Sequence, residues 1–240
     1  MKQNNPLCRP LHWLMAAVML AGAGCSLVTP SEFYQLQAPP GEAVVSKHQE
    51  TAVLLGPVKL ADYLQREQIL QRQADGSLSA SRNGRWAGHL EDEIGQLLLR
   101  QMAMRLGSSH VALYPDRIGV EPGAQIVLSI SRLDSGEGEP AILEAQWRLL
   151  DGAGKVRDSK VLTLKAEHED KLASQVRAQS ELLVQLSEQL ADAVRQLHSG
   201  QHKAVKRQSA SNQKSSKADI RKGSSMPVAE PAQEFEVYRF

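Results

Sequence analysis

Apolar residues recur along this chain with two different periods, and the two periods predict a domain of both strands and helices. Every second residue is apolar in 125–133, where Ile126, Leu128 and Ile130 alternate with smaller or polar neighbours, which is typical of a half-buried strand. Two further strands are predicted at 142–150 and 156–166. Their short connections, a loop at 134–140 and the turn Asp151-Gly-Ala-Gly154, predict an antiparallel meander.

A period of 3.6 residues predicts two long helices. The first covers 86–106, with an apolar stripe that includes Leu90, Ile94 and Leu98, and it is closed by Gly107. The second covers 170–197, with an apolar stripe of leucines and valines at helical spacing. The acidic run Glu91-Asp92-Glu93 falls in the first turns of the first helix, where the helix dipole favours negative charge.

Between 51 and 81 the pattern indicates shorter strands. Residues 51–60 are rich in Val and Leu but are interrupted by Gly56-Pro57, which predicts a strand with a bend or an edge position. Residues 68–72 and 77–81 flank Asp75-Gly76, a pair typical of a hairpin turn. The whole predicts an α/β (α+β) sandwich, with a mixed, largely antiparallel sheet and two long helices.

The amino terminus has the pattern of an export signal. Lys2 and Arg9 precede an unbroken run of 12 apolar and small residues at 13–24. That run is shorter than the roughly 20 residues that a transmembrane helix needs, so residues 1–24 are interpreted as a cleaved signal peptide. Gly22-Ala23-Gly24-Cys25 resembles the lipobox of bacterial lipoproteins, although Gly22 stands where Leu is usual. Lipidation is therefore expected on Cys25.

Composition divides the rest of the chain into three parts. Residues 25–50 contain several Pro and polar residues and are interpreted as a lipidated tether, with a short extended patch around Phe33. Residues 51–198 form the globular domain. From 199 to 240 the chain is rich in Ser, Gln, Lys and Ala and is interpreted as a disordered basic tail. Its last residues, 234–240, alternate like a strand and either add to a sheet edge or fray.

Charge and motifs exclude several kinds of function. The formal net charge is +1, without the basic excess of a nucleic-acid binder, although 199–222 holds seven Lys or Arg and one Asp. The chain has no Gly-x-Ser-x-Gly, phosphate-binding glycine loop or Cys-x-x-Cys. His198 and His202 have helical pair spacing, but Gly200 lies between them and no acidic or Cys ligand is near. We therefore expect neither catalysis nor a metal or other cofactor beyond the lipid on Cys25.

One stretch resembles a known family. Leu55-Gly-Pro-Val-Lys-Leu-Ala-Asp-Tyr-Leu-Gln-Arg-Glu-Gln-Ile-Leu-Gln-Arg72, followed by Arg85-Trp86 and by Trp147 in a late strand, resembles the ABC-type transport auxiliary lipoprotein family, the PqiC (YmbA-like) proteins. The patch Tyr34-Gln-Leu36 fits the same pattern. The similarity runs from about Cys25 to Leu197, whereas His89 replaces an expected Pro and the basic tail is not part of the pattern.

The resemblance implies a fold akin to the amino-terminal domain of TolB and no catalytic residue. It implies a lipid-anchored component at the periplasmic face of the outer membrane, in contact with outer membrane lipid. Its partner would be a mammalian-cell-entry (MCE) domain protein, one that forms a tunnel carrying lipids across the periplasm. Homo-oligomer formation is left open, and no nucleic-acid partner is expected.

A turn with an aromatic, an aliphatic and a cationic side chain is the candidate partner-binding site. Its residues are Tyr63, Leu64 and Arg66, joined by Arg85, and Tyr and Arg are enriched at interface hot spots. The alternative is that Tyr63 and Trp86 pack on the domain's own sheet while the two arginines pair with local acids. Two other functions stay open, an envelope-assembly lipoprotein acting through the tail and a periplasmic hydrolase.

Overall fold

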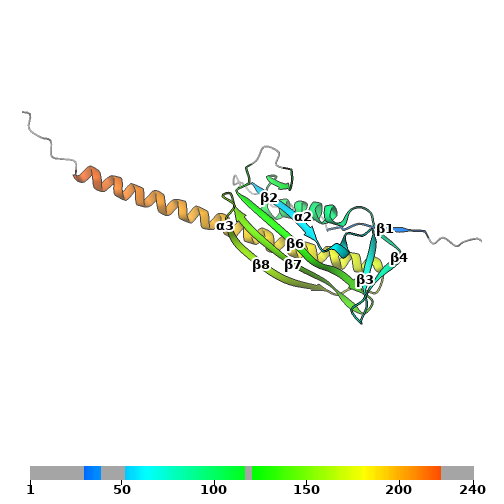
Figure 1. Ribbon diagram of the computed structural model, residues 1–240. Coiled ribbons are helices and arrows are strands. Elements are labelled where there is room, and N and C mark those ends of the chain that lie inside the picture. Colours follow the sequence, from blue (N-terminus) through cyan, green and yellow to red (C-terminus); the bar gives the residue numbers. More distant parts are fainter. Residues whose placement is uncertain (1–29, 39–51, 117–120, 223–240) are drawn as a thin grey trace, which may run out of the picture.

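The computed structural model describes residues 30–38, 52–116 and 121–222, with side chains as far as residue 200. The described chain forms one mixed sheet, a short 3-10 turn and two α-helices (Figure 1). In chain order the elements are β1 (Glu32–Tyr34), β2 (Val53–Leu60), η2 (Asp62–Leu64), β3 (Gln68–Arg72), β4 (Leu78–Trp86), α2 (Leu90–Leu106), β5 (Val111–Leu113), β6 (Ala124–Gly136), β7 (Glu139–Asp151), β8 (Val156–Ala166) and α3 (Leu172–Lys222).

The sheet forks along the long strand β6. One edge of β6 pairs with β7, which pairs with β8, and both pairings are antiparallel as the sequence predicts. The other edge is shared, because β2 pairs with the first half of β6 and β3 joins it near Ser135, both in parallel. Strand β5 continues the sheet from β2, and β4 and then β1 continue it from β3.

Gly136 allows β3 to approach β6 closely enough to pair with it. A Cβ atom at Gly136 would lie 1.8 Å from the backbone oxygen of Arg72 on β3, which no real side chain tolerates. A residue without a side chain is therefore required where β3 meets β6.

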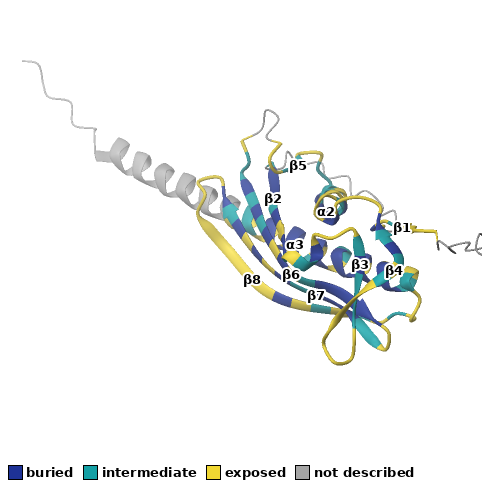
Figure 2. Cartoon of the chain, turned by 45° about the vertical axis from the view of Figure 1, so that its right-hand side comes forward, coloured by how far each residue is buried: buried dark blue, intermediate teal, exposed yellow. Residues whose placement is uncertain are grey.

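Both helices pack on one face of the sheet, and the core lies between them and the strands (Figure 2). Helix α2 contacts β2 and β5, and α3 contacts β6, β7 and β8. Alternate residues of β7 point into this core, including Leu143 and Trp147, each at most 2% exposed. The opposite face of β7 and β8 carries exposed residues such as Gln146 and Val161. The predicted α+β architecture is therefore confirmed.

The first helix begins four residues later than predicted. Residues 85 and 86 complete β4 instead, because they pair with β1 and the Trp86 amide donates a hydrogen bond to the carbonyl of Glu67. Trp86 is buried at 7% exposure and Gly88 follows it before the helix starts at Leu90. The end at Gly107 is as predicted, with φ of 61° and amide bonds back to the last turn.

One strand extension and one short strand were not predicted. The predicted loop 134–140 is reduced to a tight turn at Glu137-Gly138, because β6 extends to Gly136 and β7 starts at Glu139. The alternating apolar pattern stops before this extension, so the sequence could not place it. Strand β5 at 111–113 was not predicted, since three residues are too few to show a period.

The predicted tether contains part of the domain. Strand β1 pairs in parallel with β4, and Leu36 behind it is only 3% exposed. The backbone amide of Leu36 donates to a carboxylate oxygen of Glu93 at 3.0 Å, and that of Gln37 donates to Ser180 Oγ at 3.2 Å. The tether interpretation of 25–50 is therefore corrected for 32–38. Cys25 lies outside the described residues.

Helix α3 does not end at Leu197 but continues to Lys222, and its far part projects beyond the sheet at the end opposite β1 (Figure 1). The disordered tail expected from 199 is thus corrected as far as 222. Ser, Gln, Lys and Ala lack apolar surface but are acceptable helix formers, and one Gly costs only about 1 kcal/mol in a helix. Residues 223–240, including the alternating segment 234–240, lie outside the described residues.

Candidate functional site

The predicted partner-binding residues are split between the interior and the surface. The turn η2 directly follows β2 and precedes β3, which pairs with β6 near Ser135. Leu64 is buried at 6% exposure and Tyr63 is half-buried. Arg66 is exposed, and Arg85 reaches Glu67 in a surface ion pair of 3.7 Å. Tyr63 and Trp86 therefore pack against the domain's own core and Arg85 pairs with a local acid, as the alternative interpretation expects. Arg66 lies at the surface.

Tyr63 is held by a buried carboxylate that sequence reasoning missed. Its hydroxyl donates to Asp134 Oδ2 at 2.9 Å. Arg72 donates to both oxygens of Asp134, at 3.0 and 2.7 Å, and Arg132 Nε donates to Oδ1 at 2.9 Å. The Asp134 side chain is only 1% exposed, so these donors replace the water that burial removes.

This network sets the protonation of its members. Burial alone would raise the pKa of Asp134, but hydrogen bonds from Arg72, Arg132 and Tyr63 outweigh burial and lower the pKa below its ordinary value. Burial and the adjacent charge of Asp134 raise the pKa of Tyr63 to about 12. Asp134 is therefore a charged, fully engaged acceptor that ties η2 and β3 to β6, and its position favours a structural role over acid–base chemistry.

A polar groove lies beside the predicted turn, between that turn and the amino-terminal end of α2. We call it the α2 groove. It encloses about 500 Å³ and is lined by Leu60, Gln65, Arg66, Glu67, Gly88, His89, Leu90, Glu91 and Asp92. Arg66 is the sole cation among these residues, against three carboxylates. The groove thus offers one exposed guanidinium in an otherwise acidic and hydrogen-bonding surface.

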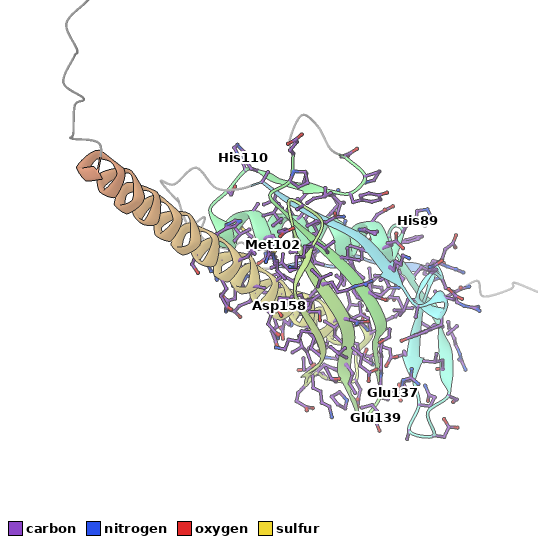
Figure 3. The ribbon with its side chains drawn as sticks, turned by 60° about the vertical axis from the view of Figure 1, so that its left-hand side comes forward. His89, Met102, His110, Glu137, Glu139 and Asp158 are labelled. Carbon is purple, nitrogen blue, oxygen red and sulfur yellow. The ribbon has the colours of Figure 1, made fainter. Side chains whose placement is uncertain are left out.

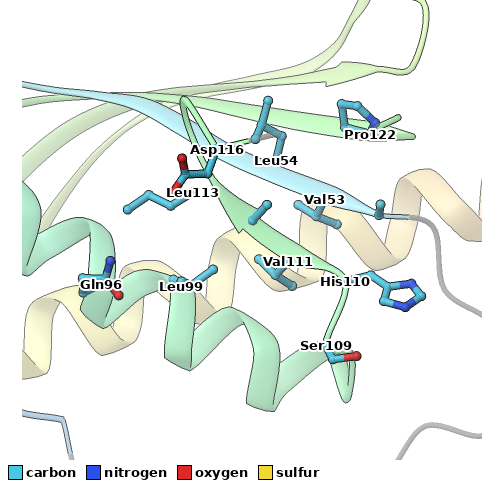
Figure 4. Close-up of a pocket in the computed structure, with 12 residues that line it drawn as sticks. Val53, Leu54, Gln96, Leu99, Ser109, His110, Val111, Leu113, Asp116 and Pro122 are labelled. Carbon is cyan, nitrogen blue, oxygen red and sulfur yellow. The ribbon is translucent and has the colours of Figure 1, made fainter. Parts of the chain in front are cut away.

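A second, more apolar pocket of about 310 Å³ lies at the other end of α2 (Figure 4). Val53, Leu99 and Val111 come from β2, α2 and β5 and face one another there, while Ser109 and His110 lie at its edge. No periodicity in the sequence identifies this pocket, because it depends on the unpredicted strand β5.

The structure groups no metal-binding set among its described side chains. His89 and His110 lie at opposite ends of α2 and Met102 faces the interior between them (Figure 3). In residues 30–38, 52–116 and 121–200 no three His, Cys, Asp or Glu side chains are grouped to hold a metal ion. The side chain of His202, the proposed neighbour of His198, is outside this range. None of the described helices is both long and apolar enough to span a bilayer.

Comparison with known proteins links this geometry to a family. The family model for the ABC-type transport auxiliary lipoprotein component matches residues 34–191. That range begins at the last residue of β1 and ends within α3, so it includes β2 to β8, the Asp134 network and the α2 groove. No curated protein matches this chain.

Two crystal structures share the fold. One, of a protein from Xanthomonas campestris, is 16% identical with a TM-score of 0.58, over 72% of this chain and 99% of that one. The other, of an uncharacterized protein, is 15% identical with a TM-score of 0.57, over 69% of this chain and 99% of that one. At these identities the likeness shows the arrangement of strands and helices alone.

Proposed function

This chain belongs to the ABC-type transport auxiliary lipoprotein family, and we propose from that premise that it serves an MCE-type lipid transport system as its non-enzymatic outer-membrane lipoprotein. In this role the domain docks the periplasm-spanning tunnel at the outer membrane. The observation that carries the proposal is the family match over residues 34–191, which is most of the described chain.

Attachment to the membrane is assigned to a lipid on Cys25. Each buried acyl CH₂ contributes about 0.8 kcal/mol, so a multiply acylated cysteine holds a protein firmly where a single chain does not. Mass spectrometry of the mature protein extracted from membranes should find a triacylated amino terminus at Cys25. In Cys25→Ala the modification and the membrane association should both be lost. An unmodified mature protein that starts at another residue would contradict the anchor.

The α2 groove is the surface that we assign to the tunnel protein. Arg66 is exposed at its rim and has rigid support, because the preceding Leu64 is buried and Tyr63 is bound to Asp134. A guanidinium in a well-ordered setting donates several hydrogen bonds with fixed geometry, which suits recognition of carboxylates or backbone carbonyls. Tyr63 and Leu64 then support the contact without being part of it, and Arg85 contributes through its pair with Glu67.

Co-purification in mild detergent tests the docking surface. The wild type should retain an MCE-domain protein, and Arg66→Ala should retain about tenfold less, since truncated hot spots cost at least 1–2 kcal/mol. Arg100→Ala is the matched control, because Arg100 is an exposed arginine on α2 outside the groove and its loss should change nothing. Stable complexes that contain no MCE-domain protein would refute the assigned system.

A second function rests on the carboxy-terminal part of α3. Residues 199–222 continue the helix beyond the domain and carry seven Lys or Arg against one Asp. An envelope-assembly lipoprotein could act through this basic arm. Deletion of residues 199–240 separates the two functions, since tunnel docking through the α2 groove survives the deletion and an activity of the arm does not.

A further inference from the structure

We propose that the β1 end of the domain rests on the lipid surface, with the side chain of Phe33 inserted at the boundary between headgroups and acyl chains. The inference rests on the proposed lipid anchor at Cys25 and adds to it an orientation of the domain. It follows from three features: the exposure of Phe33, the short length of chain between Cys25 and Phe33, and the hydrogen bonds that fix the segment after Phe33 to the domain.

In residues 32–36, Phe33 is the large apolar side chain that remains exposed to solvent. It is 67% exposed, whereas Tyr34 is half-buried and Leu36 is 3% exposed. Strand β1 pairs with β4 on one side only and forms an end of the sheet, so Phe33 lies on an edge of the molecule. A large aromatic ring in water at such an edge is stabilised when it enters an apolar phase.

Strand β1 also shortens the tether. Had residues 25–50 been free, the anchor could have held the domain well above the headgroups. Because β1 starts at Glu32, only seven residues lie between Cys25 and Phe33, and the eight Cα–Cα steps span at most about 29 Å when fully extended. A flexible chain of that length has an r.m.s. reach of only about 15 Å. Leu27 and Val28 lie in this linker, so its sequence is itself compatible with a lipid surface.

The segment after Phe33 is fixed to the domain, which makes the orientation definite. The carbonyl of Tyr34 accepts a hydrogen bond from the amide of Ala87 at 2.8 Å. The amides of Leu36 and Gln37 are bound to Glu93 on α2 and Ser180 on α3. An anchor that holds β1 near the bilayer therefore positions both helices and the sheet relative to it.

The charged residues around Phe33 indicate whether the contact depends on the charge of the lipid headgroups. Arg85 is its register partner on β4, and Arg82 is exposed on the same strand, while Glu32 and Glu67 balance them. This balance gives little attraction to phosphate groups in particular. We infer that the apolar ring and the anchor govern the contact, and that it persists on uncharged lipid and at high salt.

Fluorescence quenching by brominated lipid tests the orientation. The full acylated chain, carrying either Phe33→Trp or Val161→Trp, is reconstituted into phosphatidylcholine vesicles with bromine on the acyl chains. Val161 is the matched control, because it is 74% exposed on β8, another edge strand of the sheet. The wild type supplies the background from Trp86 and Trp147, which are 7% and 2% exposed.

The added fluorescence of Phe33→Trp should fall about twofold or more, and that of Val161→Trp should not change. Equal quenching of both variants, or none of either, overturns the orientation. The acyl mass on Cys25 and flotation with the vesicles, measured on the same samples, separate the two proposals. An acylated, floating protein with an unquenched Phe33→Trp refutes this inference alone, whereas a chain without acyl groups refutes the anchor and the orientation together.

Discussion

Asp134 joins three parts of the fold through one carboxylate. It lies near the end of β6 and accepts hydrogen bonds from Tyr63 of η2, Arg72 of β3 and its own neighbour Arg132. Burial of a charge is unfavourable unless donors replace its water, and here four hydrogen bonds do so. The position of β3 against β6 therefore depends on the charge of one residue.

We expect Asp134→Asn to lower the free energy of unfolding by about 2–3 kcal/mol. This is less than the 3–5 kcal/mol of a fully buried pair, because Arg72 and Arg132 are each 23% exposed and keep some hydration. Urea unfolding measures the loss. Asp192→Asn is the control, since it removes an exposed ion pair with Arg195 worth only about 0.3–0.5 kcal/mol. Equal effects of the two substitutions would contradict a central role for Asp134.

Tyr63 should make the domain sensitive to alkaline pH. The fold raises its pKa from the ordinary 10.0 to about 12, so the folded state favours the neutral phenol. The stabilisation that neutral Tyr63 contributes is complete below pH 10, falls as the pH rises from 10 to 12, and is absent above pH 12. In Tyr63→Phe the free energy of unfolding should fall less steeply across this range. Denaturant unfolding at a series of pH values measures both curves, and parallel curves would refute the assignment.

The sequence predicts the position of a residue well when that position follows from the apolar periodicity of a strand or helix. It does not predict the position of a residue that is held by hydrogen bonds to residues far away in the chain. Trp147, expected in the core from its place in an alternating strand, is 2% exposed. Asp134 is followed by Ser135 and Gly136, a sequence that is typical of a loop. Its burial depends on hydrogen bonds from Arg72 and Tyr63, which are more than sixty residues away in the chain.

Among the elements, β1 decides where the domain begins. It has only three residues, and its sequence is too short to show alternation. The hairpin of β3 and β4, the meander of β6 to β8 and the end of α2 at Gly107 could all be predicted, because each is defined by local turns and periods. The parallel pairings of β2 and β3 with β6 could not, because they join segments far apart in the chain.

If β1 and its continuation belong to the domain, Leu36→Ala should be costly. Truncation of a buried leucine destabilises proteins by about 2–5 kcal/mol, and Leu36 is 3% exposed in the core. Phe33→Ala, three residues earlier, should change the free energy of unfolding by less than about 0.5 kcal/mol, because its ring is in water. Thermal or urea unfolding of the two variants without lipid makes the comparison. A mild effect of Leu36→Ala would restore the tether interpretation.

On the scale of the whole molecule, the described chain has two distinct ends. Strand β1 lies at one end of the sheet, and the far part of α3 leaves at the other (Figure 1). The α2 groove lies near the first end and the apolar pocket near the second, since they flank the two ends of α2. With β1 at the lipid surface, α3 extends away from the membrane, and its residues 199–222 add about 36 Å of helix in that direction.

Residues 32–37 make contacts that also bear on the order in which an exported chain would fold. Leu36 binds Glu93, 57 residues later, and Gln37 binds Ser180, 143 residues later. In a chain that is exported amino terminus first, β1 can pair with β4 once residue 86 has emerged, whereas Gln37 reaches Ser180 only after almost the whole domain has followed. The contact of Gln37 with Ser180 is therefore among the last to form in such a chain.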